Sequence, residues 1–296
     1  MIAVEAIGLG KRYRGHWALR SCDLAVPEGR IVGLIGANGA GKTTLMHLAV
    51  GLQQPSEGAI RVLGQPPEAD AAQLARVGFL AQDAPTYPYL TVAEHLRLGR
   101  ALNSAWDDDF ARRRVAGLGL DPHQSAGRLS GGQRSQLALT LALGKHPELL
   151  LLDEPVSSLD PLARRQFLQD LMELVAEDGP TVVLSSHLLS DVERICDHLV
   201  VLANGHVQLE GPVDELLATH KVLTGARRDR VAFPQDQLIV QLRTTERQTT
   251  ALVRTSQPIL DPHWAVSDIG LEELVLAYMA MEPVASAPDG LSVVHS

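Results

Sequence analysis

The most informative segment of the chain is Ile31-Val32-Gly33-Leu34-Ile35-Gly36-Ala37-Asn38-Gly39-Ala40-Gly41-Lys42-Thr43-Thr44. Its first five residues form an uninterrupted apolar run, which is typical of a strand buried on both faces of a parallel sheet. The next eight match the phosphate-loop pattern G-x-x-x-x-G-K-[ST] in full. A helical pattern follows over residues 43–52. A strand, a glycine-rich loop and a helix in this order predict a phosphate-binding βα unit.

The residue types of this loop suit the phosphates of a nucleotide. Glycines allow backbone N–H groups to turn toward phosphate oxygens at the positive end of the helix dipole. Lys42 is expected to neutralise the β- and γ-phosphates, and the Thr43 hydroxyl to ligate Mg²⁺. The alternative is a glycine-rich turn without a ligand, which the Lys-Thr pair and both flanks disfavour. The predicted binding residues are Gly36, Asn38, Gly39, Ala40, Gly41, Lys42, Thr43 and Thr44.

A second apolar run, residues 149–152, leads directly into Asp153 and Glu154. With a helical pattern over 162–175 and a third apolar run over 181–184, it predicts a βαβ unit. Parallel strands carry functional groups at their carboxyl ends, so Asp153 is expected to bind Mg²⁺. Glu154 is then placed to polarise an attacking water as general base. Taken alone, an Asp-Glu pair after four leucines also fits a helix start or a solvated loop.

The remaining patterns divide the chain into two regions. Residues 2–7, 18–26 and 59–63 predict antiparallel strands, and residues 91–119 predict helix, opened by the capping box Thr91-x-x-Glu94. Arg112, Arg113 and Arg114 are read as a solvated helix face. We place an ATP-binding domain at 1–220, with a helical subdomain at about 84–145, and a C-terminal accessory region at 221–296. That region follows every nucleotide motif and is therefore expected to be dispensable for nucleotide binding but not for regulation or partner assembly.

The accessory region has a weaker pattern of its own. After a polar stretch at 223–234, residues 238–242 and 250–253 predict short strands, and residues 271–281 predict a helix. The last dozen residues are rich in Pro, Ser and Ala and are expected to be disordered.

Composition excludes several classes of protein. The chain has 296 residues with 26 Lys and Arg against 35 Asp and Glu, a net charge of −9. This charge disfavours a nucleic-acid partner, because polyphosphates select basic surfaces. Two cysteines are too few for a disulfide scaffold and fit a reducing compartment. Apolar runs are far shorter than the ~18 residues of a membrane span, and the N-terminus does not read as a signal peptide.

The segment Leu129-Ser130-Gly131-Gly132-Gln133 resembles the signature of the ATP-binding-cassette (ABC) ATPases. The spacing Ser130-x-x-Gln133 is also a helix capping box, and both readings can hold because a glycine-rich helix start is a ready anion site. The resemblance implies that Ser130, Gly131, Gly132 and Gln133 grip the γ-phosphate of an ATP held by the opposite subunit.

Four further residues resemble elements of the same family. Gln82 resembles the glutamine that contacts Mg²⁺ and water, and Asp160 lies in Ser158-Leu159-Asp160, which resembles the loop that crosses to the other subunit. His187 resembles the switch histidine that contacts the γ-phosphate. Tyr13 resembles the aromatic residue that stacks on adenine, although Trp17 nearby leaves a packing role open for an aromatic there.

The resemblance covers residues 1 to about 220 and implies a fold, an activity and partners. The fold is an α/β P-loop ATPase with a mainly parallel core sheet, an antiparallel β subdomain, a helical subdomain and a small C-terminal α+β appendage. The activity is ATP hydrolysis with Mg²⁺ by a transporter subunit that dimerises, as a homodimer in the simplest case, around two ATP.

The implied partner is a separate multi-helix permease, contacted from Gln82 to Leu90, at the cytoplasmic face of the cell membrane. The helix opening with Leu271-Glu272-Glu273-Leu274 resembles that of exporter-type ATPases, which favours export. The alternative is a soluble ABC ATPase that serves in assembly or as a scaffold and has no transport role.

Overall fold

The computed structural model describes residues 1–67, 71–83, 86–157, 159–176, 179–227 and 237–281. Its centre is a six-stranded sheet in which four neighbouring pairs are parallel and the last pair is antiparallel. The strands lie in the order β5 (Val77–Leu80), β6 (Leu149–Leu152), β7 (Thr181–Ser186), β3 (Ile31–Ile35), β8 (His198–Ala203) and β9 (His206–Pro212). This confirms the mainly parallel core sheet predicted from the apolar runs.

Both faces of the central sheet are covered, as continuous apolar strands require. Leu149 and Leu151 of β6 lie in one apolar cluster with α1 (Lys42–Ala49), whereas Leu150 and Leu152 lie in another with α5 (Gly131–Leu143) and α6 (Pro161–Val175). A short helix, α7 (Leu189–Ile195), follows β7. The carboxyl ends of β3, β6 and β7 therefore place Gly36, Asp153 and His187 at one edge of the sheet.

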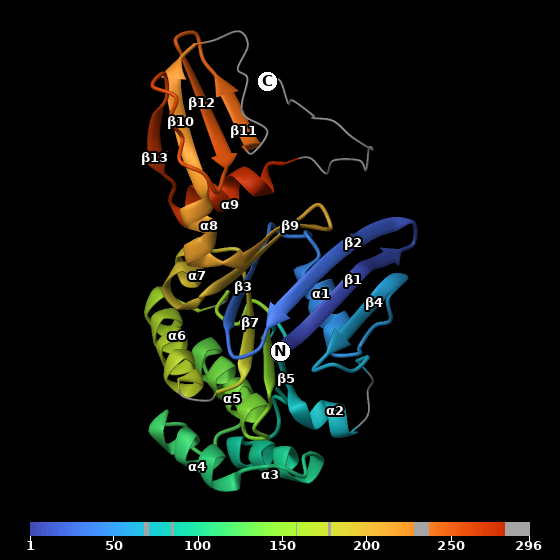
Figure 1. The fold of residues 1–296 in the computed structure, drawn as a ribbon. Helices are drawn as coiled ribbons and strands as arrows, with labels where there is room; N and C mark the ends of the chain where they lie inside the picture. The colour runs from blue at the N-terminus through green and yellow to red at the C-terminus, as the bar shows by residue number, and fades with distance from the viewer. Residues whose placement is uncertain (68–70, 84–85, 158, 177–178, 228–236, 282–296) are drawn as a thin grey trace.

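A three-stranded antiparallel sheet packs on the α1 side of the core (Figure 1). It contains β2 (His16–Pro27), β1 (Ile2–Tyr13) and β4 (Glu57–Val62) in that order, with α1 packed beneath it. Leu9 and Leu19 of this sheet share a buried cluster with Leu45 and Met46 of α1. The predicted antiparallel strands are thus confirmed, and they hold α1 from the side opposite the central sheet.

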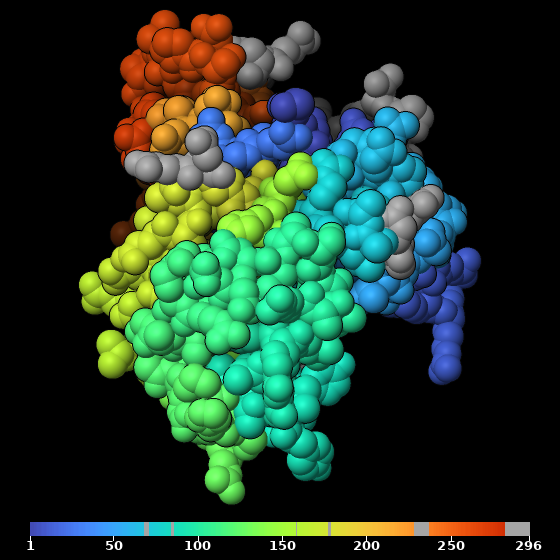
Figure 2. All heavy atoms as spheres, turned by 90° about the horizontal axis from the view of Figure 1, so that it is seen from below, coloured from blue at the N-terminus to red at the C-terminus, as the bar shows by residue number. Residues whose placement is uncertain are grey.

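Helices form the far end of the molecule, which faces the viewer in Figure 2. The predicted helical stretch 91–119 divides into α3 (Val92–Leu102) and α4 (Asp108–Gly117), and α2 (Ala71–Arg76) precedes β5. The capping box is present at Thr91, whose hydroxyl accepts from the Glu94 N–H at 3.2 Å. Asp107 starts α4 by accepting from the Phe110 N–H at 2.8 Å.

The prediction that Arg112, Arg113 and Arg114 form a solvated face is wrong for Arg114. Its guanidinium is half-buried and donates to Gln136 Oε1 at 2.7 Å and to Thr140 Oγ1 at 3.2 Å. Gln136 in turn donates to Asp170 on α6 at 2.7 Å. The helical pattern of α4 alone could not reveal this, because the two acceptors on α5 lie more than 20 residues further along the chain.

The C-terminal region forms a second antiparallel sheet above the core (Figure 1). Its order is β11 (Leu238–Thr244), β12 (Gln248–Arg254), β10 (His220–Ala226) and β13 (Ala265–Asp268), and it is connected to β9 by α8 (Val213–Thr219). β10 extends into the stretch predicted to be a polar connection, because it pairs on both sides, with β12 and β13. The predicted disordered end, residues 282–296, lies outside the described residues.

Helix α9 (Leu271–Met279) lies between the C-terminal sheet and the central sheet. Leu274 and Val275 are fully buried in one cluster with Leu199 and Val201 of β8 and with Leu252 of the C-terminal sheet. The accessory region therefore shares a core with the ATP-binding region. Within the described ranges, no helix is both long and apolar enough to cross a membrane.

Candidate nucleotide site

The loop after β3 has space only for glycine at two positions. A Cβ atom on Gly41 would lie 2.6 Å from the Ala18 carbonyl oxygen, and φ is +111° there. A Cβ atom on Gly36 would lie 2.3 Å from the Leu202 carbonyl oxygen. The loop is thus pressed against β2 and β8, and its exposed residues Ala37, Asn38 and Gly39 face solvent.

The amino-terminal end of α1 has no side-chain cap. Its first N–H groups therefore keep their capacity for an external acceptor, and the helix dipole favours a negative one. In contrast, α5 and α6 begin with side-chain caps from Ser130 and Asp160. The start of α1 therefore offers N–H groups of the kind that the sequence predicts for a phosphate loop.

Lys42 lies at the bottom of the loop, and its side chain is 5% exposed. The ammonium donates to the Gly36 carbonyl oxygen at 2.8 Å and lies 3.1 Å from Glu154 Oε1. A buried ammonium needs such acceptors, because they compensate the hydration that it loses. These contacts hold the Lys42 side chain beneath the exposed backbone of the loop.

Glu154 connects the phosphate loop with His187. Its second carboxylate oxygen, Oε2, lies 3.0 Å from His187 Nδ1, and its backbone is left-handed with φ +45°. The carboxylate is 9% exposed, whereas the imidazole is 40% exposed. The predicted lysine, general base and switch histidine, which span 146 positions of the sequence, thus meet at one point.

Asp153 and Thr43 are a suitable donor set for Mg²⁺. Asp153 is 1% exposed at the end of β6, and Thr43 is exposed in the first turn of α1. The described part of the chain contains no cluster of three acidic, His or Cys side chains that would hold a metal alone. Mg²⁺ commonly uses one or two protein oxygens together with substrate phosphates, and these residues fit that pattern.

Sequence reasoning missed Ser185. Its hydroxyl, fully buried in β7, contacts both Asp153 and the backbone of Glu154. Ser185 directly follows the apolar run of β7, the strand that pairs with β6. This position could have identified it as a neighbour of Asp153.

The signature segment forms the start of α5, on the helical side of the molecule. Ser130 Oγ accepts from the Gln133 N–H at 3.2 Å, and Gln133 Oε1 accepts from the Ser130 N–H at 2.9 Å. The capping-box interpretation is therefore confirmed. Among the described residues, no hydrogen bond or ion pair joins this segment to the phosphate loop.

Comparison with known proteins identifies the family to which the chain belongs. A family model described as ABC transporter matches residues 19–157. The nickel import ATP-binding protein of Rhodobacter capsulatus is 40% identical over 246 residues, which cover 76% of this chain and 95% of the relative. The chain belongs to the ABC transporter ATP-binding proteins.

Two further relatives of this ABC protein are informative. The bacitracin transport ATP-binding protein of Enterococcus faecalis is 33% identical over 72% of this chain and 70% of the relative. A dimeric ATP-binding cassette in a post-hydrolysis state with ADP and Pi has a TM-score of 0.64 and 25% identity, and covers 71% of this chain and 98% of that cassette. This ABC protein is accordingly an ATP-binding and ATP-hydrolysing subunit.

The other residues predicted for this ABC protein lie where strands end or helices begin. Asp160 Oδ1 accepts from the N–H groups of Leu162 and Ala163, both at 3.0 Å. Gln82 is exposed in the turn after β5. The Tyr13 hydroxyl donates to Gln53 Oε1 at the end of β1. Ser158 lies outside the described residues.

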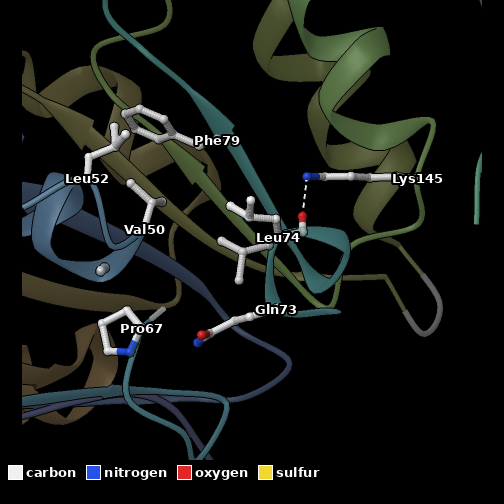
Figure 3. A pocket seen from close by; sticks show the side chains of 9 residues that line it. Val50, Leu52, Pro67, Gln73, Leu74, Phe79 and Lys145 are labelled. Atoms are coloured by element: carbon white, nitrogen blue, oxygen red, sulfur yellow. Dashed lines mark hydrogen bonds between the residues drawn. The ribbon is translucent and has the colours of Figure 1, made fainter. Parts of the chain in front are cut away.

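A groove runs across β5 between the core and the helical end of the ABC protein. Figure 3 shows its first part, of about 190 Å³, lined mainly by apolar side chains. Lys145 reaches across from the end of α5 and donates to the Leu74 carbonyl oxygen. Phe79 and Lys145 also line a second hollow of about 210 Å³ that extends to Asn103. We call the two hollows together the β5 groove. Their residues are Ala49, Val50, Leu52, Pro67, Gln73, Leu74, Val77, Phe79, Leu80, Asn103, Ala138, Leu141, Ala142 and Lys145.

Proposed function

We propose that this ATPase works as a dimer that binds two ATP and drives a separate membrane permease. The proposal rests on two features of one chain. The phosphate loop is complete, with Lys42, Glu154 and His187 in contact. The signature segment is also complete, but among the described residues it makes no hydrogen bond or ion pair to that loop. A signature supplied by a second copy would complete each site.

In this proposal, the chain's own groups have separate tasks. The loop N–H groups and Lys42 bind the phosphates, and Tyr13 packs on the adenine. Asp153 and Thr43 would hold Mg²⁺, and Gln82 would lie near the ion. When bound, Mg²⁺ would screen the charge of the phosphates.

The remaining groups act in hydrolysis and dimerisation. Glu154 accepts a proton from water, His187 orients the γ-phosphate, and Asp160 lies at the subunit boundary. A homodimer has two competent sites, because every motif is present in one chain.

The β5 groove is the proposed docking site for one helix of the permease. It is mainly apolar, and Leu52 and Leu74 at its rim are 65% and 44% exposed. Gln82 follows β5 directly, so a helix in the groove would lie next to the metal-sensing position. The predicted contact from Gln82 to Leu90 adds Tyr87 and Tyr89, which are 62% and 94% exposed. Ala84 and Pro85 lie outside the described residues.

Export is the direction that we propose. The opening of helix α9, Leu271-Glu272-Glu273-Leu274, resembles that of exporter-type ATPases, and this resemblance supports the direction. The permease would hold the ATPase at the cytoplasmic face of the membrane.

Permease docking is tested by a charge placed at the rim of the β5 groove. Leu52→Glu should leave ATP hydrolysis by the purified protein unchanged within twofold, because Leu52 is exposed and remote from the phosphate loop. In the source cells, it should lower the fraction of a tagged chain that sediments with membranes and co-purifies with a multi-helix protein. Leu260→Glu, an 87% exposed leucine in the C-terminal unit, is the matched control.

Equal membrane recovery of the wild type, Leu52→Glu and Leu260→Glu would remove the groove as a docking site. Complete absence of the wild-type chain from membranes would instead favour the soluble, non-transport ABC ATPase.

A further inference from the structure

Ser185 lies beside the Asp153–Glu154 pair because of the register of two parallel strands. Leu152 of β6 is paired with Leu184 of β7, so the next residues of the two strands, Asp153 and Ser185, are neighbours at the carboxyl edge of the sheet. Ser185 has no exposed surface, and Asp153 has 1%. A buried hydroxyl is stable there only if its donor and acceptor capacities are used.

Both capacities are used on the site residues themselves. The Ser185 hydroxyl donates to Asp153 Oδ1 at 2.7 Å, and Ser185 Oγ accepts from the Glu154 N–H at 2.8 Å. The Asp153 N–H donates to the Leu80 carbonyl oxygen of β5 at 2.8 Å. One hydroxyl therefore fixes the carboxylate of one site residue and the backbone of the next.

This double contact has two consequences. Asp153 is held through Oδ1, so Oδ2, which has no hydrogen bond to the described residues, remains for a metal. The Glu154 N–H is held where the backbone turns left-handed, at φ +45°, a conformation that non-glycine residues adopt only when their surroundings impose it. That turn directs the Glu154 carboxylate toward Lys42 and His187.

We propose that Ser185 is a positioning residue of the ATPase site, which orients Asp153 for the metal of Mg-ATP and Glu154 for water activation. Groups that orient a metal ligand typically change metal affinity about 10- to 100-fold when they are removed. The inference rests on the proposed role of Asp153 toward Mg²⁺. It predicts an effect on the metal-dependent part of ATP binding beyond any effect on stability.

A purely structural hydroxyl on the same strand provides the control. Thr181, at the other end of β7, is 3% exposed, and its hydroxyl accepts from the Gly29 N–H at 2.9 Å. Thr181→Val removes that hydroxyl with little change in shape. Both substitutions remove the hydroxyl of a buried residue of β7, but only the Ser185 hydroxyl contacts Asp153.

The experiment measures the dissociation constant of ATP by calorimetry, once with Mg²⁺ and once with EDTA, on the full chain. The ratio of the two constants is the gain in affinity that the metal supplies. We expect Ser185→Ala to lower this gain by about tenfold or more, with ATP binding in EDTA unchanged within twofold. Thr181→Val should keep the wild-type gain, and Ser185→Thr, which retains the hydroxyl, should restore most of it.

Two further readouts separate positioning from folding. Thermal unfolding measures the loss of stability in Ser185→Ala, which removes two hydrogen bonds, and in Thr181→Val, which removes one. The Mg²⁺ concentration at half-maximal ATP hydrolysis should rise in Ser185→Ala alone.

A wild-type gain in Ser185→Ala, or an equal loss in Thr181→Val, would overturn the role of Ser185. Failure of the metal role itself would look different, because then neither Asp153→Asn nor Ser185→Ala would alter the gain. Alanine is smaller than serine and introduces no steric clash at position 185. The test therefore does not depend on whether the larger Ser185→Thr variant folds.

Discussion

Glu154 contacts both the phosphate-loop lysine and the histidine that follows β7. One oxygen of its carboxylate lies 3.1 Å from Lys42 Nζ and the other lies 3.0 Å from His187 Nδ1. Phosphates entering the loop compete with this carboxylate for the ammonium of Lys42, because both are anions that seek the same donor. In the proposed function, this would leave the Glu154 carboxylate available to accept a proton from water when the phosphates bind.

Glu154→Gln tests this role at the residue scale. The amide has the same shape and leaves Asp153 unchanged, so Mg-ATP should still bind. ATP hydrolysis should fall by about 10²–10⁴, the usual contribution of a general base. Phosphate release measures the rate, and size-exclusion chromatography with Mg-ATP should show an accumulated dimer.

The control for the dimer is Ser130→Arg added to Glu154→Gln. Its bulk at the signature should separate the subunits, while each monomer still binds ATP through its own loop. A Glu154→Gln protein that hydrolyses ATP at the wild-type rate would exclude Glu154 from catalysis. One that stays monomeric at saturating ATP would make dimer closure dependent on the permease.

At the scale of elements, α9 is connected to the start of β10 through His220 and Tyr278. His220 Nδ1 lies 2.6 Å from the Leu216 carbonyl oxygen, and Nε2 lies 2.9 Å from the Tyr278 hydroxyl. A carbonyl oxygen only accepts, so Nδ1 carries the hydrogen and the neutral ring accepts from Tyr278 at Nε2. Burial lowers the pKa of His220 and raises that of Tyr278, which keeps both groups neutral.

The free energy of unfolding should therefore decrease as the pH falls below about 6.5, the ordinary pKa of histidine. In that range the unfolded chain binds a proton at His220 that the folded chain does not, so acid favours unfolding. One such group contributes at most about 1.4 kcal/mol per pH unit. Urea unfolding at pH 7.5, 6.5 and 5.5 measures the slope.

His220→Gln is the comparison for this slope, because it removes the titrating ring and leaves other groups in place. His198 has a pKa also lowered by burial and remains in both proteins. The slope should be smaller in His220→Gln than in the wild type. Equal slopes in the two proteins would contradict the assignment.

At the scale of the whole molecule, the C-terminal unit completes the core of the ATPase. Leu274 and Val275 of α9 have no exposed surface and lie in one cluster with Leu199 and Val201 of β8. The sequence predicts that the region after residue 220 is dispensable for ATP binding. The packing of α9 leads to the opposite expectation, because its removal would expose an apolar face of the central sheet.

Deletion of residues 221–296 should therefore yield a chain that aggregates or binds a hydrophobic dye, as seen by size-exclusion chromatography and fluorescence. Deletion of residues 282–296 is the control and should leave a monodisperse protein that binds Mg-ATP. A chain ending at His220 that is monodisperse and binds Mg-ATP with wild-type affinity would restore the original boundary.

The features that could be predicted before the structure was known are short contiguous motifs. The loop from Gly36 to Thr43 and the Asp153–Glu154 pair are specified by residue type and spacing alone. The β-strands of the core can be predicted equally well from the sequence, because a buried parallel strand must be apolar throughout. The capping box at Ser130 was readable for the same reason, since its partners are three residues apart.

Only the tertiary structure decided which distant groups meet. Strand register placed Ser185 against Asp153, and chain folding brought Lys42 to Glu154 and Arg114 to Gln136. The covering of the central sheet by α9 was decided in the same way. Local patterns depend on the helix and strand periods, whereas these contacts depend on strand order and on the packing of side chains between elements, which no short segment encodes.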